Sequence, residues 1–159
     1  MNAVAGVLEA PGPLVWSDAH VLGYAPMDDI HEAFVDIVGR MQLAADDDLP
    51  VLLDSFMQHA EAHFEEENRW MVDTQFPPRA CHIEQHNAVL NSAAEVRALL
   101  TEGDHATCRR FAFALADWFP NHTAHLDSAL AHWMVKRQHG GKPLVFRTLP
   151  AHPETPATL

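Results

Sequence analysis

The chain has 159 residues, a length that predicts a single domain. Hydrophobic residues make up 48% of the sequence, which is enough for a substantial core and argues against intrinsic disorder. The 22 acidic residues outnumber the 10 Lys and Arg, so the formal net charge is −12. Because such a surface repels phosphate groups and anionic lipid headgroups, we expect no nucleic-acid partner and no membrane partner.

Nothing near the N-terminus is typical of an exported protein. The stretch from Met1 to Pro11 has no Lys or Arg before its mildly apolar residues, so it does not resemble a secretory signal. Only Cys81 and Cys108 are present, too few for a disulfide framework. We therefore expect a cytoplasmic protein.

Four segments carry apolar residues with helical spacing: 28–45, 48–73, 79–101 and 105–136. Asp28 or Asp29 is expected to cap the first, and Asp48 the second, with Pro50 in its first turn. Proline and glycine mark residues 1–27 as an irregular N-terminal arm and 137–159 as an irregular C-terminal tail. Helices joined by short connections predict an all-α fold, an antiparallel up-down four-helix bundle over 28–136.

Several of the 12 histidines fall on the predicted inward faces of these helices. In 79–101 the inward stripe opens with His82 and His86, one turn apart. His63 and Glu67 share the inward stripe of 48–73, and the remaining inward histidines are His31 and His122. Burying an ionisable side chain that has no partner destabilises the fold by roughly several kcal/mol. A bound cation satisfies all of these side chains at once, so the pattern favours a metal site over a plain bundle.

The order and spacing of these residues resemble the hemerythrin family, and its single-domain bacterial form most closely, over residues 16 to about 133. The resemblance is carried by the following motifs: Asp28-x-x-His31, His63-Phe64-Glu65-Glu66-Glu67, His82-x-x-x-His86 and Trp118-x-x-x-His122-x-x-x-x-Asp127. It implies two iron ions in an oxo- or hydroxo-bridged di-iron centre. In that centre His82, His86 and His122 would bind one iron, His31 and His63 the other, and Glu67 and Asp127 would bridge the two.

The resemblance also implies a function, the reversible binding of dioxygen for storage, delivery or sensing. The two-histidine iron keeps an open position, and no catalytic residue is required, so a non-enzyme is expected. Trp118, Phe119 and Thr123 are expected to line the oxygen pocket. The Thr123 hydroxyl either faces this pocket, where it would admit water, or bonds to a backbone carbonyl.

Two other functions remain open, and the sequence identifies no protein partner. One is a di-iron redox or detoxifying protein acting on peroxide or nitric oxide. The other is a sensor module whose iron or oxygen state changes a partner interface. A ferritin-like site is disfavoured, because it needs two Glu-x-x-His motifs and the chain has only Glu102-x-x-His105, at a predicted turn.

Pro120 lies inside the last predicted helix, two residues before His122. On an ideal α-helix, residues five apart point about 140° away from each other, which separates His122 from Asp127. An interior proline usually kinks a helix. We therefore expect a kink at Pro120 to bring this pair to one cluster.

Overall fold

The computed structural model describes residues 11–140. The helices in this part of the chain are, in order, η1 Asp18–His20, α1 Ala25–Leu43, η2 Asp46–Asp48, α2 Leu49–Asp73, α3 Arg79–Thr101, α4 His105–His122, the π turn η3 Thr123–Asp127, and α5 Ser128–Gln138. No strand occurs among the described residues, so the all-α prediction is confirmed. The first ten residues of the predicted arm, and the predicted tail from residue 141 onward, lie outside the described residues.

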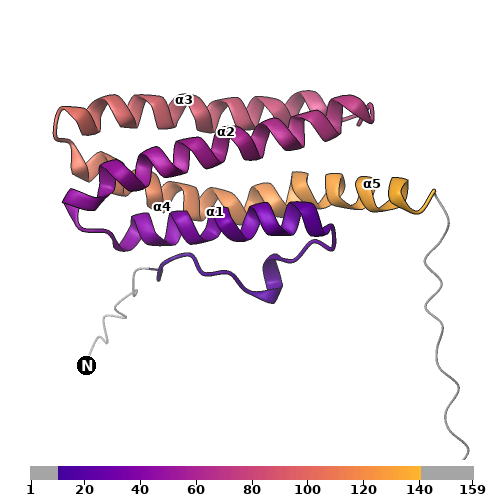
Figure 1. The fold of residues 1–159 in the computed structure, drawn as a ribbon, viewed down its shortest axis with the longest axis horizontal. Helices are drawn as coiled ribbons and strands as arrows, with labels where there is room; N and C mark the ends of the chain where they lie inside the picture. The colour runs from indigo at the N-terminus through magenta and orange to yellow at the C-terminus, as the bar shows by residue number, and fades with distance from the viewer. Residues whose placement is uncertain (1–10, 141–159) are drawn as a thin grey trace, which may run out of the picture.

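The long helices form an antiparallel bundle in which each helix packs against two neighbours (Figure 1). The α1 helix contacts α2 and α4, and α3 contacts the same two helices from the other side. The predicted fourth segment appears as a single long rod made of α4, η3 and α5. The predicted bundle is therefore confirmed, with one irregular turn inside its last helix.

The start of α1 differs from the prediction. The helix begins at Ala25, and Tyr24 is its N-cap residue, so the cap predicted at Asp28 or Asp29 is wrong. The Asp28 carboxylate instead accepts hydrogen bonds from the backbone N–H groups of Leu22 and Gly23, at 2.7 and 3.0 Å. A carboxylate inside the first turn thus ties the arm to the helix, where it also complements the helix dipole.

The start of α2 follows the prediction more closely. Asp48 is the residue that precedes the helix, and a proline stands in the first turn. The Asp48 side chain makes no capping hydrogen bond, however. Proline is suited to this position because its missing N–H has no partner in the first turn of a helix.

The core consists of two apolar clusters at different levels of the bundle. The larger cluster contains Phe34, Phe56, Phe64, Leu115 and Phe119 among others, and the smaller contains Tyr24, Met27, Trp70, Met71, Phe76, Leu130 and Ala131. On α1, α2 and the α4–α5 rod, the residues of one cluster are separated along the chain from those of the other by a short interval. Buried polar side chains occupy these intervals: His31 on α1, Glu67 on α2, and His122 and Asp127 on the rod, while His63 lies just before the interval on α2.

The π turn marks where the last helix changes register. The backbone N–H of Ser128 bonds to the carbonyl of Thr123, five residues earlier, in place of the usual four. Single π turns inside α-helices recur at functional sites, because the extra residue rotates the following side chains. The rod therefore continues past His122 with its faces rotated.

The described part of the N-terminal arm lies against α1. The backbone N–H of Leu14 donates to the side-chain oxygen of Gln42 at 2.7 Å, and Trp16 stacks on His20 with ring centroids 5.4 Å apart. The arm crosses α1 at Gly39, where a Cβ atom would collide with the Leu14 carbonyl oxygen. Glycine is required here because only its backbone allows the two chain segments to approach so closely.

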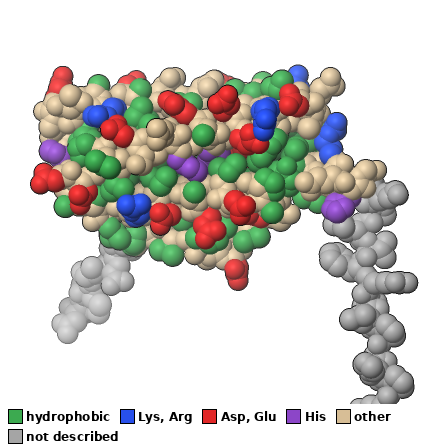
Figure 2. All heavy atoms as spheres, viewed as in Figure 1, with side chains coloured by type: hydrophobic (Ala, Val, Ile, Leu, Met, Phe, Trp, Pro, Cys, Tyr) green, Lys and Arg blue, Asp and Glu red, His purple; other side chains and the backbone are tan. Residues whose placement is uncertain are grey.

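The surface reflects the acidic composition. Figure 2 shows many acidic side chains scattered over one face and few basic ones, with histidine atoms emerging near the middle. None of the helices in residues 11–140 combines the length and the apolar character that a membrane span needs.

We predict that Gly39→Ala loosens the arm and lowers the free energy of unfolding by about 1–3 kcal/mol, the usual cost of overpacking. The measurement is urea unfolding, together with limited proteolysis of the arm. Gly12→Ala is the matched control, because no atom lies within 4 Å of a Cβ at that position. Equal stability of the two variants would contradict the close approach at Gly39.

Candidate metal centre

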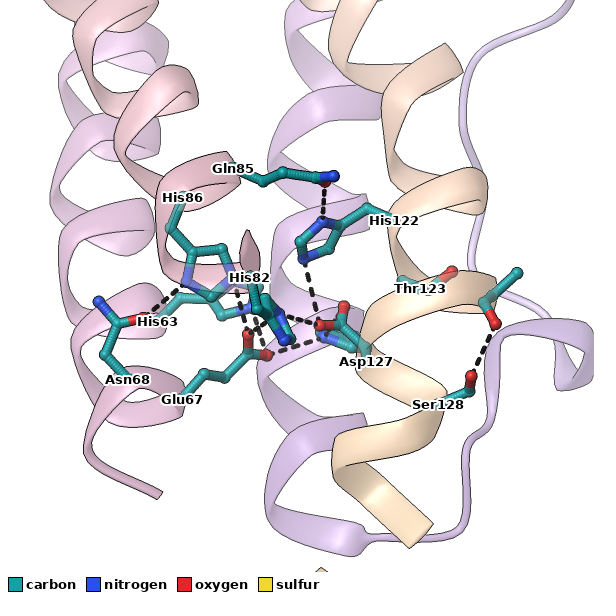
Figure 3. Close-up of polar contacts among 12 residues, drawn as sticks. His63, Glu67, Asn68, His82, Gln85, His86, His122, Thr123, Asp127 and Ser128 are labelled. Atoms are coloured by element: carbon teal, nitrogen blue, oxygen red, sulfur yellow. Dashed lines mark hydrogen bonds and ion pairs between the residues drawn. The ribbon is translucent and has the colours of Figure 1, made fainter. Parts of the chain in front are cut away.

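Seven ionisable side chains from all parts of the bundle meet at one level between the two apolar clusters. They are His31, His63, Glu67, His82, His86, His122 and Asp127, none more than 4% exposed. Their ligand atoms form two groups that share Glu67: one also contains His31 and His63, and the other contains His82, His86, His122 and Asp127. The structure therefore brings together every residue proposed as a ligand. Figure 3 labels all of them except His31.

Glu67 faces both groups of histidines, one oxygen to each. Its Oε1 lies 3.2 Å from Nε2 of His31 and 2.9 Å from Nε2 of His63. Its Oε2 lies 3.2 Å from Nε2 of His86 and 3.7 Å from Nε2 of His82. This arrangement is the one that a carboxylate bridging two metal ions requires.

Asp127 repeats the arrangement from the opposite side of the site. Its Oδ2 lies 3.2 Å from Nε2 of His31. Its Oδ1 lies 2.9 Å from Nε2 of His82 and 3.2 Å from Nε2 of His122. The two carboxylates thus span the same pair of histidine groups.

Two histidines have their tautomer fixed by neighbouring amides. Nδ1 of His86 lies 2.8 Å from the amide oxygen of Asn68, and Nδ1 of His122 lies 2.9 Å from that of Gln85 (Figure 3). Since an amide oxygen only accepts, each Nδ1 carries the hydrogen and donates it. In the neutral ring, Nε2 then holds only a lone pair, and it points at a carboxylate oxygen.

Facing lone pairs repel each other unless a cation lies between them. The buried ligand atoms without a hydrogen-bond partner include Nε2 of His82, His86 and His122, Oε2 of Glu67 and both oxygens of Asp127. Their close spacing also suits a metal, because bonds of about 2.1 Å at right angles separate two ligand atoms by about 3.0 Å. Imidazole and carboxylate are a donor set that suits iron. The residues therefore fit a metal centre.

The electrostatics keep both carboxylates ionised. Burial raises the pKa of Glu67, but the charge of His63 and hydrogen bonds from His31 and His63 outweigh it and hold the pKa well below its usual range. Burial and the neighbouring Glu67 likewise raise the pKa of Asp127, but its close polar contacts with His122, His31 and His82 outweigh both and hold the pKa below its usual range. Ionised carboxylates are the form that binds a cation.

The surroundings shift the pKa values of two of the imidazoles in opposite directions. Burial lowers the pKa of His31, but hydrogen bonds to Asp127 and Glu67 outweigh it and raise the pKa to about 9. At His86 burial outweighs the attraction of Glu67 and lowers the pKa to about 4. His86 therefore stays neutral near pH 7, as a metal-binding imidazole must.

The π turn brings His122 and Asp127 to the same site. These residues are five apart, and the i→i+5 bonding between Thr123 and Ser128 turns both toward the core. The turn begins three residues after Pro120, whose carbonyl accepts a hydrogen bond from the Thr123 N–H. The structure thus assigns the change of register to the π turn and not to a kink at the proline itself.

The three residues expected at the oxygen pocket lie in different places. Phe119 meets the ring of His31 edge-on at 5.3 Å, beside the two-histidine group. Trp118 stacks on His122 at 4.2 Å, beside the three-histidine group. The Thr123 hydroxyl donates to the Pro120 carbonyl at 3.1 Å, the second of the two orientations considered for it.

Sequence reasoning gave no site role to four further side chains. Phe34 stacks on Phe119 at 4.8 Å and meets His63 edge-on at 5.8 Å, and its position three residues after His31 could have indicated this. Asn68 and Gln85 adjoin Glu67 and His86 in sequence, but only the tertiary structure pairs them with His86 and His122.

The fourth is His59, one turn before His63, with ring centroids 5.4 Å apart. Its Nε2 is buried without a hydrogen-bond partner among the described residues. Burial and the nearby His63 lower its pKa to about 4. Of the remaining histidines, His125, His132 and His139 are exposed, His20 and His105 are half-buried, and His152 lies outside the described residues.

Comparison with known proteins agrees with this geometry. The sequence model of the family described as "Hemerythrin HHE cation binding domain" matches residues 22–133. The chain is 38% identical over 122 residues to a protein of Ralstonia nicotianae named Bacteriohemerythrin, covering 77% of this chain and 89% of that relative. It is 27% identical over 117 residues to a hemerythrin subunit of Sipunculus nudus, covering 74% of this chain and 90% of that relative. The chain belongs to the hemerythrin family.

Proposed function

We propose that this protein is a non-haem di-iron protein that binds dioxygen reversibly. The observation that carries the proposal is the bridging geometry, in which Glu67 and Asp127 each direct one oxygen to each histidine group. Two metal ions, one per group, satisfy both carboxylates and all five imidazoles. The names of the two relatives, a bacteriohemerythrin and a hemerythrin subunit, support iron and dioxygen as the metal and the ligand.

The ligand assignment follows the two groups. His82, His86 and His122 would hold one iron, and His31 and His63 the other. Glu67 and Asp127 would bridge them, together with an oxo or hydroxo group. The two-histidine group supplies one protein nitrogen fewer, so the iron held there would be the one that takes dioxygen. Two ferrous ions, when bound, would supply the two electrons that reversible dioxygen binding uses.

The protein side chains around the two-histidine group exclude water. Phe34 is fully buried and Phe119 is 1% exposed, and the two rings stack at an interplanar angle of 18°. Both rings contact a histidine of this group, His63 and His31 respectively. An apolar wall disfavours charged species leaving the site and protects it from hydrolytic side reactions. This supports reversible binding over turnover.

The role we propose is that of a carrier, store or sensor and not of an enzyme. The Thr123 hydroxyl, the polar group expected to bring water to the pocket, is instead bonded to a backbone carbonyl. With this hydroxyl occupied, the side chains that the structure places against the two-histidine group are apolar rings, metal ligands and His59, whose ring lies 5.4 Å from that of His63.

The direct test is to load the apo-protein anaerobically with Fe(II), count bound iron, and follow the visible spectrum during cycles of oxygen and argon. We expect two irons per chain and an absorption band that appears with oxygen and disappears when oxygen is removed. A band that bleaches irreversibly, or steady consumption of peroxide or nitric oxide, would favour the redox or detoxifying alternative. Failure to bind two metal ions would refute the proposal.

The bridging role of Glu67 predicts that Glu67→Gln reduces bound iron from two ions per chain to one or none, because an amide supplies less charge and cannot bridge as an anion. The measurement is metal content after removal of loosely bound iron, with circular dichroism to confirm folding. Glu65→Gln is the matched control, since Glu65 is exposed on the same helix. Retention of two irons by the Glu67 variant would contradict the bridging assignment.

The apolar wall predicts that Phe119→Leu shortens the lifetime of the oxygen-dependent absorption band on the order of tenfold, as a barrier lowered by about 1.4 kcal/mol would do. The physical reason is that the smaller side chain lets water reach the two-histidine group. Iron content should stay unchanged, because Phe119 is not a ligand. Phe113→Leu serves as the control, because Phe113 is 37% exposed on the same helix and faces away from the core. Equal lifetimes in the two variants would argue against the wall.

A further inference from the structure

The two histidine groups differ in how firmly their rings are held. In the three-histidine group, Nδ1 of His86 donates to Asn68 and Nδ1 of His122 donates to Gln85. In the two-histidine group, Nδ1 of His31 and Nδ1 of His63 are buried and have no hydrogen-bond partner among the described residues. The two groups therefore differ in how their imidazole rings are oriented, as well as in how many histidines they contain.

Aromatic stacking increases the difference. Phe64 lies flat on His86, with centroids 4.1 Å apart and an interplanar angle of 11°. Trp118 lies on His122 at 4.2 Å and 24°. Each of these two imidazoles is thus fixed by an amide at its edge and by an aromatic ring on its face, which leaves Nε2 one direction in which to point.

The rings of the two-histidine group have neither an amide partner at Nδ1 nor a stacked aromatic neighbour. His31 meets Phe119 edge-on at 5.3 Å, and His63 meets Phe34 edge-on at 5.8 Å and lies tilted by 45° to Phe64 at 4.9 Å. Edge contacts restrain a ring less than a hydrogen bond combined with a stacked neighbour, because the ring can still rotate about its χ2 angle. His82, the third member of the better-held group, also has an unpartnered Nδ1. An amide and a stacked aromatic ring therefore hold two of the three rings in the three-histidine group, and neither ring in the two-histidine group.

Amide partners act on a metal site in two ways. A hydrogen bond from Nδ1 fixes the tautomer that leaves Nε2 free to bind the metal, and it reduces the entropy lost when the ring is ordered. Asn68 reaches from α2 to α3, and Gln85 from α3 to α4, so each bond also holds a ligand in place between two helices (Figure 3). Loss of such partners typically costs about 10- to 100-fold in metal affinity.

We propose that Asn68 and Gln85 are positioning residues that make the three-histidine position the tighter of two metal positions, so that it fills first and empties last. This inference rests on the proposed function, because it takes the seven side chains to hold two metal ions. It predicts a defined one-metal form, in which His82, His86 and His122 hold the ion while the dioxygen-binding position is vacant.

The experiment is an anaerobic titration of the full-length apo-protein with Fe(II) in competition with a chromogenic Fe(II) chelator. The wild type should bind two ions in two resolved steps. Asn68→Ala and Gln85→Ala should each weaken the first step about 10- to 100-fold. Asn87→Ala, which removes an exposed amide next to His86 on the same helix, is the matched control and should leave both steps unchanged.

Rescue variants separate positioning from general stability. Asn68→Asp and Gln85→Glu keep an oxygen that accepts from Nδ1, so the first step should return to the wild-type affinity or exceed it. The thermal midpoints of the apo-proteins provide a readout that does not depend on metal. If the alanine variants lower this midpoint while both binding steps match the Asn87→Ala control, the amides are merely structural and the inference fails.

The wild-type titration distinguishes this inference from the proposed function. Two ions bound with a single affinity would overturn the inference and leave the di-iron proposal standing. Binding of fewer than two ions at saturation would overturn both. Two resolved steps, with the first weakened by the alanine variants and restored by the acidic ones, would establish the positioning role.

Discussion

The structure depends on one electrostatic constraint: two carboxylates, Glu67 and Asp127, lie in the middle of the core with almost no solvent exposure. An isolated buried carboxylate is strongly destabilising, so the surrounding side chains must supply compensation. Five imidazoles do so only in part, because Nε2 of His86 and of His122 turns a lone pair toward these oxygens. Cations at this level would complete the balance. A helix bundle suits this task because each of its members can bring a ligand to one level, while the apolar clusters on either side exclude water.

A local irregularity in the bundle helps to assemble the buried cluster of histidines and carboxylates. The π turn interrupts the last helix where His122 and Asp127 must share one side. An ordinary α-helix would direct one of them away, so the irregular turn gives the site both a nitrogen and a bridging oxygen from a single rod. Farther from the site, the Asp28 carboxylate and Gly39 attach the N-terminal arm to α1. The arm in turn brings His20 to within 6.0 Å of Phe119, so it packs behind the wall of the two-histidine group.

The two halves of the site are suited to different tasks. The three-histidine half has two rings fixed by amides and aromatic stacking, which suits an ion that stays in place. The two-histidine half is bordered by Phe34 and Phe119 and has fewer ligands, which suits an ion that accepts and releases a small molecule. A shared pair of carboxylates couples the halves, so that charge added at one is felt at the other.

The helices and the seven side chains that meet between them could be predicted from the amino-acid sequence. Helical period and the four-residue spacing of His63 with Glu67, and of His82 with His86, place such residues on one face whatever the tertiary details. Helical spacing also placed His31 and His122 on inward faces, and the resemblance to the hemerythrin family added Asp127. Other features depend on packing between segments, which spacing along the chain cannot express. The pairing of Asn68 with His86 and of Gln85 with His122 joins different helices, and the orientation of Thr123 is a choice between two available acceptors. The start of α1 also lay beyond local rules, because Asp28 bonds to the arm in preference to capping its own helix. The π turn escaped prediction for the same reason, since the backbone gives up a regular hydrogen bond there only because buried ligands on the other helices compensate for it.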